Sequence, residues 1–410
     1  MHIGLNWSIE LSVEGYEAVF EAAGEDKLFP RLRAVAWNAD YVDFNLVNCV
    51  LSPSLKNLHF ATDSLDVADI EILRDVQEAC PGIQRLRYGA TQDAKAEHEA
   101  VKELVKLAFK FPLVAFSAAC VEQSDIPFLA TQRSLRKLAI DIGVLHKKGA
   151  GVPLWELPQQ SFSFINELSL QFPLSLTACK HLLRSSSFLE LRALALRPHQ
   201  LTPQRLASFL QTLRKAIVRP DLLERLDIFE GGPSQWDATT AKPLHEQELT
   251  PLLDFPSLTH LVLCSSSDVD ISEEMLASMA TAWPNLQTLF IYSRCSARKA
   301  PLLHVRDLHH IVWGCRHLER LAIRVSAEEE PILTDELPEF GFEHPLKELA
   351  ISSAPIAQAD IVATVIGTYF PRLQTLSWSD EGRDSDRWEH LMFDLGEQVQ
   401  KKSWKEYLNR

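Results

Sequence analysis

The cysteines of this 410-residue chain form no Cys-x-x-Cys pair, and their number, seven, is odd. A disulfide framework would need an even set of cysteines, and a zinc ribbon would need two close pairs. The sequence therefore predicts buried thiols in a reducing compartment rather than a covalent or metal framework.

Long apolar runs are also missing. No segment approaches the roughly 18 apolar residues of a membrane span, and residues 1–20 lack the basic start and unbroken apolar core of a signal peptide. We therefore expect no membrane partner and a cytoplasmic or nuclear location. The formal net charge of −14 argues against nucleic acid as a partner, because phosphate contacts need clustered Lys and Arg.

Catalytic phrases are absent as well. The sequence has no G-x-S-x-G, H-E-x-x-H or P-loop motif, and its histidines show no spacing typical of metal ligands. The acidic pairs at 268–270 and 384–386 have no EF-hand frame and indicate solvated turns. We expect that the protein is not an enzyme and that it has no catalytic residue, no cofactor and no metal. A hydrolase with a loop-borne site stays as an alternative, which would need a constellation assembled only by the fold.

What the sequence does contain is a repeated phrase of the form Φ-x-x-Φ-x-Φ, where Φ is apolar. The copies recur at a mean spacing of about 28 residues, and a period of 20–29 residues with this pattern is the signature of leucine-rich repeats. The copy at Leu113 is the most degenerate. The first apolar residues of the copies are Leu32, Leu55, Ile83, Leu113, Leu135, Ile165, Leu191, Leu223, Leu258, Leu286, Leu318, Leu346 and Leu373.

Each phrase predicts a short strand with one buried face, and the segments between phrases predict helices. Residues 202–217 begin with Thr202 as N-cap and Pro203 in the first turn, and residues 272–283 begin with Ser272 as cap. The fold class we predict is α/β, a leucine-rich-repeat solenoid. It is a curved horseshoe with parallel strands on the concave face and helices on the convex face.

An aromatic residue or Cys followed by Pro precedes several phrases, as in "AWPNLQTLFI" (282–291) and "YFPRLQTLSW" (369–378). Pro cannot continue a helix, and it biases the preceding residue toward extended backbone. These pairs therefore predict the corner between a helix and the next strand. The pairs are at Phe29, Cys80, Phe255, Trp283 and Phe370.

The predicted organisation has three parts. Residues 1–27 form an incomplete N-terminal repeat or helix, residues 28–380 the leucine-rich-repeat domain, and residues 381–410 a C-terminal capping helix. The N-terminal part lacks a strand phrase, so we expect either a shortened chain or a further domain upstream. Segments 145–164, 230–250 and 293–304 are predicted loops at one rim, where recognition and mere tolerance of insertion are equally plausible.

On the concave face, the residue between the last two apolar positions is small in many repeats, as at Ala36, Ala322 and Ala350. Larger side chains interrupt this row on neighbouring repeats. Aromatic and Arg clusters are typical anchors of protein interfaces, so we predict one partner-binding patch there; the alternative is ordinary variation on a solvent face. The predicted patch comprises Phe229, His260, Phe290, Tyr292, Arg197, Arg225, Arg320 and Arg324.

The phrases "FPRLRAVAW", "FPSLTHLVL", "WPNLQTLFI", "CRHLERLAI" and "FPRLQTLSW" resemble the fungal F-box/leucine-rich-repeat proteins, especially the large families of mushrooms. The resemblance covers about residues 28–380. It implies a substrate receptor of an SCF-type (Skp–cullin–F-box) ubiquitin ligase, in which F-box helices bind the Skp adaptor and the repeats hold the target. No F-box phrase is visible here, so a Skp partner is expected only if an F-box lies upstream.

Three function classes follow. The first is a non-catalytic protein-interaction module, plausibly the substrate-recognition part of such a ligase, with a protein partner on the concave face. The second is a free-standing repeat scaffold with no role in ubiquitin transfer, and the third is the hydrolase with a loop-borne site. The sequence does not identify the target.

Overall fold

The structure is a computed structural model, and it divides into two compact units, residues 1–145 and 146–410. This boundary falls inside the segment predicted as a single repeat domain. No helix among the described residues is both long and apolar enough to cross a lipid bilayer. The described residues are 18, 31–38, 51–62, 67–90, 98–121, 125–142, 157–158, 161–174, 176–198, 201–230, 242–293, 302–327, 343–351, 356, 358–378, 385–395 and 399–401.

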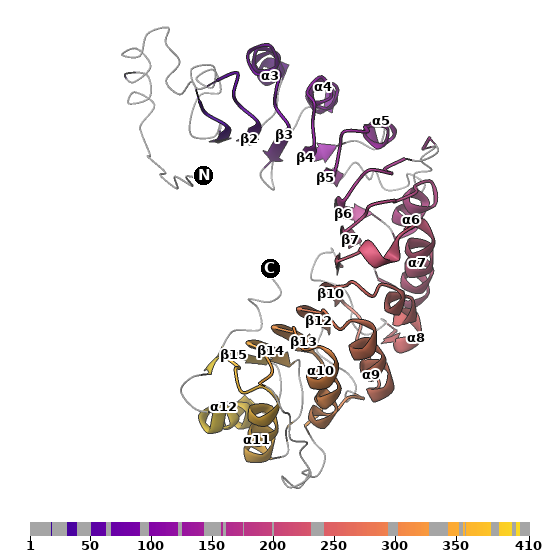
Figure 1. Cartoon of the computed structure of the whole chain (residues 1–410), viewed down its shortest axis with the longest axis vertical. Coiled ribbons are helices and arrows are strands. Elements are labelled where there is room, and N and C mark those ends of the chain that lie inside the picture. Colours follow the sequence, from indigo (N-terminus) through magenta and orange to yellow (C-terminus); the bar gives the residue numbers. More distant parts are fainter. Residues whose placement is uncertain are drawn as a thin grey trace. The chain divides into compact units, whose positions relative to one another are not determined.

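The first unit contains a parallel sheet in the order β1-β2-β3-β4-β5. Three helices alternate with its later strands and lie along one side of them (Figure 1). The elements are β1 (Ala34–Asn38), β2 (Asn57–Thr62), α3 (Val67–Ala79), β3 (Arg85–Ala90), α4 (His98–Ala108), β4 (Ala115–Val121), α5 (Ile126–Ala130) and β5 (Lys137–Ile142).

The second unit begins with three parallel strands and continues the same alternation, with its helices again along one side of its strands (Figure 1). Its first half comprises β6 (Glu167–Leu174), α6 (Leu176–Arg184), β7 (Ala193–Pro198), α7 (Pro203–Ala216), η3 (Pro220–Leu222), β8 (Arg225–Phe229), β9 (Leu244–His245), α8 (Glu246–Leu249), η5 (Thr250–Asp254), β10 (His260–Ser265) and β11 (Val269–Asp270).

The second half of this unit extends the sheet from β10 through β12, β13, β14 and β15 to β16, all paired in parallel. Its elements are α9 (Glu273–Ala282), β12 (Thr288–Ser293), η6 (Val305–Leu308), α10 (His309–Gly314), β13 (Arg320–Ile323), β14 (Glu348–Ile351), α11 (Ala359–Tyr369), β15 (Thr375–Trp378), α12 (Ser385–Leu395) and β16 (Gln400–Lys401).

The repeat phrase positions every strand that it predicts. Each of the thirteen phrases opens with an apolar residue, and a strand begins two residues later, including the degenerate copy at Leu113. From Leu55 onward that first residue is at most 5% exposed. Parallel strands in consecutive order with helices on one side define each unit as a leucine-rich-repeat solenoid, so the predicted fold class is confirmed.

The aromatic-Pro pairs form the predicted corners. Trp283 ends α9, is fully buried, and its carbonyl accepts a hydrogen bond from the Leu286 amide at 3.1 Å. Pro284 therefore occupies the second position of a tight turn, where its fixed φ is favourable. Phe255 and Phe370 accept equivalent bonds, from Leu258 and Leu373. The pair at Phe29 lies outside the described residues.

The helix starts agree with the sequence to within one residue. Helix α7 begins at Pro203, although the Thr202 side chain makes no capping hydrogen bond. In α9 the Ser272 hydroxyl accepts a hydrogen bond from the Met275 amide at 3.2 Å, which is the arrangement expected of an N-cap.

Segment 230–250 is not a simple loop. Its last residues form β9, which pairs in parallel with β11, and the short helix α8. Leu244 is fully buried there, so this end of the segment belongs to the repeat core. Residues 231–241 and most of 145–164 and 293–304 lie outside the described residues.

At the chain ends the structure describes little. The predicted N-terminal element at 1–27 lies outside the described residues except for Ala18, which is helical. Within 381–410, α12 packs beside α11, burying Trp388 and Leu391. β16 then adds a short strand next to β15. Whether this segment serves as a cap stays a prediction.

Candidate functional site

Three parallel rows of side chains cover the concave face of the second unit. The strand register aligns residues across neighbouring strands, and alternate residues share one face. The first row runs Arg225, His260, Thr288, Arg320 and Glu348; the second runs Asp227, Val262, Phe290, Ala322 and Ala350; the third contains Phe229, Cys264 and Tyr292.

The second and third rows, apart from Asp227, form an apolar floor. Phe290 and Tyr292 pack with Val262, Cys264 and the small alanines of the following strands, and Phe229 packs against this cluster from its edge. Phe290 is 6% exposed and Tyr292 only 1%. The sequence placed both on a solvent-facing patch, and the structure corrects this. Their location on the concave face is right, but neighbouring large side chains on adjacent strands bury one another.

Two arginines lie over aromatic rings of this floor. The Arg197 guanidinium is 6.0 Å from the centre of the Phe229 ring, and that of Arg320 is 5.8 Å from the centre of the Phe290 ring. Arg320 also donates to the Thr288 hydroxyl at 3.0 Å. Each cation–π contact contributes about 0.5–1 kcal/mol. These contacts orient the guanidinium groups, and Arg197 remains exposed.

Arg225 is held by a buried acid that the sequence did not single out. Its Nε and Nη2 each lie 2.6 Å from Asp227 Oδ2, and the Asp227 side chain is 5% exposed. Arg225 itself is 59% exposed. Since Asp227 would otherwise be a buried unpaired charge, this arginine has a structural role as well as a place on the surface.

His260 lies in the first row between Arg225 and Arg320, and its imidazole is neutral. Thr259 Oγ1 donates to the Glu224 carbonyl at 3.0 Å and so accepts the Nδ1 proton of His260 at 2.8 Å. Burial, followed by the charges of Arg225 and Arg320, lowers the pKa of His260. Its Nε2 is therefore a hydrogen-bond acceptor between the donors of Arg225 and Arg320.

Arg324 is not a surface residue. Its side chain is 5% exposed, with Nη1 3.4 Å from Asp268 Oδ2 and 3.8 Å from Asp270 Oδ1. It therefore ties the end of β13 to the short strand β11. The sequence predicted an accessible anchor; the structure instead gives Arg324 an internal ion pair, because the acidic pair at 268–270 reaches it from another repeat.

The structure thus separates the eight predicted patch residues into groups. Arg197 and Arg225 are exposed, Phe229, His260 and Arg320 are half-buried, and Phe290, Tyr292 and Arg324 are buried. The first five lie on β7, β8, β10 and β13, and we call them the accessible strip; β12, whose Thr288 and Phe290 are buried, lies between β10 and β13. A binding role for any of them stays a prediction.

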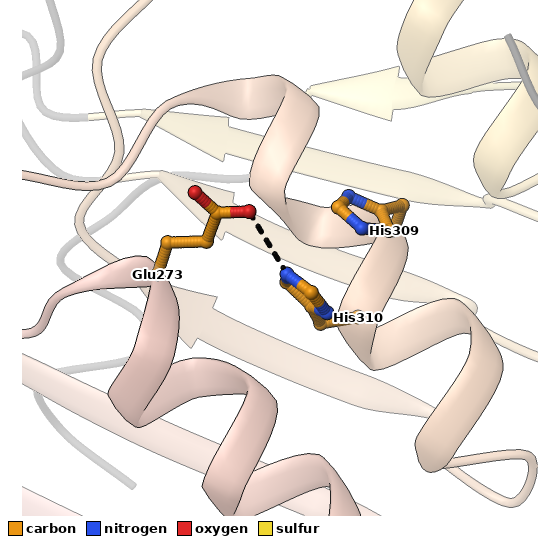
Figure 2. A group of neighbouring side chains, drawn as sticks. All are labelled: Glu273, His309 and His310. Carbon is orange, nitrogen blue, oxygen red and sulfur yellow. Dashed lines mark hydrogen bonds and ion pairs between the residues drawn. The ribbon is translucent and has the colours of Figure 1, made fainter.

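A second arrangement, on the helical side, was not foreseen from the sequence. Glu273 at the start of α9 lies beside His309 and His310 at the start of α10 (Figure 2). One potential ligand atom from each lies within 4.8 Å of the others. The adjacent histidines are visible in the sequence, but the carboxylate comes from the preceding repeat, so only helix packing reveals the group.

No family model matches the chain, and no curated protein matches it either. Similar solved structures include the Rad7–Elc1 complex from yeast, 12% identical, where 97% of this chain and 90% of that chain are covered at a TM-score of 0.47. The leucine-rich repeat-containing protein LegL7 from Legionella pneumophila is 13% identical, with 89% and 92% covered and a TM-score of 0.32.

A Bacteroides fragilis protein is 12% identical, with 96% of this chain and 74% of that chain covered at a TM-score of 0.25. All of these scores are below 0.5. The assignment to the leucine-rich-repeat class therefore rests on this chain's own repeat phrases and on the parallel strand order of each unit.

Proposed function

We propose that the second unit binds a protein partner on its concave face through the accessible strip of Arg197, Arg225, Phe229, His260 and Arg320. The observation that carries this proposal is the pair of guanidinium groups held over aromatic rings. Arginines oriented in this way lose less conformational freedom when they bind, and Arg beside aromatic surface is the usual composition of interface hot spots.

The chemistry of the strip favours an acidic segment of the partner. Guanidinium groups recognise carboxylates through paired N–H donors, and the neutral His260 adds an acceptor for a backbone or side-chain N–H. The half-buried Phe229 ring at the edge of the apolar floor would contact a neighbouring apolar side chain of the partner. The partner is a protein rather than a nucleic acid because the chain as a whole is acidic, with a net charge of −14.

The experiment is a charge reversal with a matched control. The double variant Arg197→Glu, Arg320→Glu changes two accessible arginines of the strip, and we expect affinity-purified partners to fall at least tenfold. Arg205→Glu, Lys215→Glu makes the same charge change on exposed positions of α7 and should retain them. Loss of partners from both variants, or from neither, would contradict the proposal.

We further infer, from the resemblance to F-box/leucine-rich-repeat proteins, that the bound partner is a substrate for ubiquitin transfer. The Skp adaptor would then bind through an F-box upstream of the repeats. The test is the half-life of the partner in cells, which should lengthen when this chain is removed and shorten again with the wild-type chain but not with the Arg197→Glu, Arg320→Glu variant. An unchanged half-life together with intact binding would favour the free-standing scaffold.

A further inference from the structure

We propose that Glu273, His309 and His310 form a zinc site at the junction of α9 and α10. Two imidazoles and one carboxylate are a ligand set that Zn²⁺ takes in proteins, with a fourth position left for water or another ligand. Figure 2 shows the three side chains converging from the starts of two neighbouring helices. The proposal concerns the helical side of the second unit and is independent of partner binding on the strands.

The hydrogen bonds fix the protonation of one histidine in a form suited to ligation. His309 Nδ1 lies 2.9 Å from the Arg306 carbonyl oxygen, so this nitrogen carries the proton and donates it. The other nitrogen, Nε2, is then the one with a free lone pair. A ligating imidazole whose second nitrogen is held by a backbone carbonyl is the common arrangement around protein-bound metals.

His310 and Glu273 already share a proton where the metal would bind. His310 Nε2 lies 3.1 Å from Glu273 Oε1. Zn²⁺ would take the place of the proton on Nε2 and release it to solvent. The three ligand atoms now lie within 4.8 Å of one another. Binding one zinc ion at Zn–N and Zn–O distances of about 2.0–2.1 Å would bring these atoms closer together. The Glu273 side chain is 51% exposed and free to rotate toward the histidines.

The two helices are held close together by packing on the same faces. Gly314 lies four residues after His310, on the same side of α10, and Ala280 lies seven residues after Glu273, on the same side of α9. A Cβ placed on Gly314 would come within 2.6 Å of the Ala280 Cβ and carbonyl oxygen. This close contact holds the two helices together near their ends, on the faces that carry Glu273 and His310, so the ligand group depends on helix packing as well as on its own side chains.

The test measures zinc binding by the full chain, with Zn²⁺ as the only ligand. We expect one strongly bound ion per chain after dialysis, and a loss of at least tenfold in affinity for Glu273→Gln, His309→Asn and His310→Gln. The Asn keeps a donor near the Arg306 carbonyl, and the Gln at 310 keeps a donor toward Glu273, so each variant removes ligation with little change to the fold. His317→Gln, at an exposed position just after α10, is the control and should bind zinc as the wild type does.

X-ray absorption of the zinc-loaded wild type provides a readout that needs no variant. It should show nitrogen and oxygen neighbours at about 2.0–2.1 Å with the scattering pattern of two imidazoles; sulfur neighbours at about 2.3 Å would place the ion on cysteines elsewhere. That result would overturn the proposal. Equal affinity in the wild type and in His309→Asn would also overturn it, leaving Glu273 and His310 as an ion pair between helices.

Discussion

At the scale of single residues, Arg324 is predicted to lie on the surface, but in the fold it has a structural role. The sequence places an arginine at the end of a concave strand, where anchors of interfaces are expected. In the fold its side chain is 5% exposed and faces Asp268 and Asp270. The acidic pair lies more than fifty residues earlier in the chain, and nothing in the local pattern of either segment indicates the contact.

We therefore predict that Arg324→Ala destabilises the protein rather than only weakening partner binding. Removing the cation leaves two mostly buried carboxylates without it, and the expected loss in the free energy of unfolding is about 3 kcal/mol. Chemical denaturation measures this loss directly. Arg324→Lys, which keeps the charge, should lose clearly less. Unchanged stability of the Ala variant would mean that the ion pair contributes nothing.

His344 is a second residue whose role follows from burial. It takes the place of the aromatic residue before Pro in its repeat, is 1% exposed, and donates from Nε2 to the Cys315 carbonyl at 3.0 Å. Its Nδ1 accepts from the Leu346 amide at 3.3 Å. Burial lowers the pKa of His344 to about 4, so the folded protein holds this imidazole neutral.

The consequence is a stability that falls with acid. Below the ordinary histidine pKa of about 6.5 the unfolded chain takes up a proton that the folded chain excludes, so the free energy of unfolding decreases as the pH drops from about 6.5 to about 4. Phe occupies this position in other repeats, and we predict that His344→Phe reduces the loss between pH 7 and pH 5 by about 2 kcal/mol. Denaturation at the two pH values measures it; identical losses in both proteins would be evidence against a neutral His344.

At the scale of elements, the sequence predicts strands better than it predicts surfaces. All thirteen repeat phrases correspond to strands, because apolar residues at fixed spacing have one buried arrangement in a parallel stack. The sequence does not predict the strands β9, β11 and β16, because each has only two residues and therefore shows no periodicity. The sequence also does not predict how exposed the concave side chains are, because residues of other repeats bury Phe290 and Tyr292.

The contact between α9 and α10 gives a prediction in which packing opposes helix propensity. Alanine is favoured over glycine within a helix by about 1 kcal/mol. At Gly314, however, a Cβ would approach the backbone of Ala280 to 2.6 Å, and such overpacking costs about 1–3 kcal/mol. We expect Gly314→Ala to lower the melting temperature.

Gly367 in α11 is the matched control for this prediction. A Cβ there would meet only the Leu395 Cδ2 at 3.8 Å, an ordinary contact. Gly367→Ala should therefore raise the melting temperature, or leave it unchanged, because propensity acts without a clash. Two variants that shift the melting temperature equally in the same direction would show that the helices are not packed as closely as described.

At the scale of the whole molecule, the repeats leave two kinds of surface. The concave face of the second unit presents oriented arginines beside aromatic rings, whereas the helical side presents a potential metal site that spans two repeats. The candidate strip was partly predictable, because Arg225, His260 and Arg320 share one place in the repeat phrase and Arg197 and Phe229 share another just after it. The metal group was not, because its members lie 36 and 37 residues apart along the chain.

We propose that a protein partner binds to the strip on the concave face. The most direct measurement is photo-cross-linking in cells with a benzophenone amino acid at position 197 in the strip, compared with position 211 on the exposed side of α7. We predict a discrete cross-linked partner from position 197 and none from position 211. The same products from both positions, or a product from position 211 alone, would contradict it.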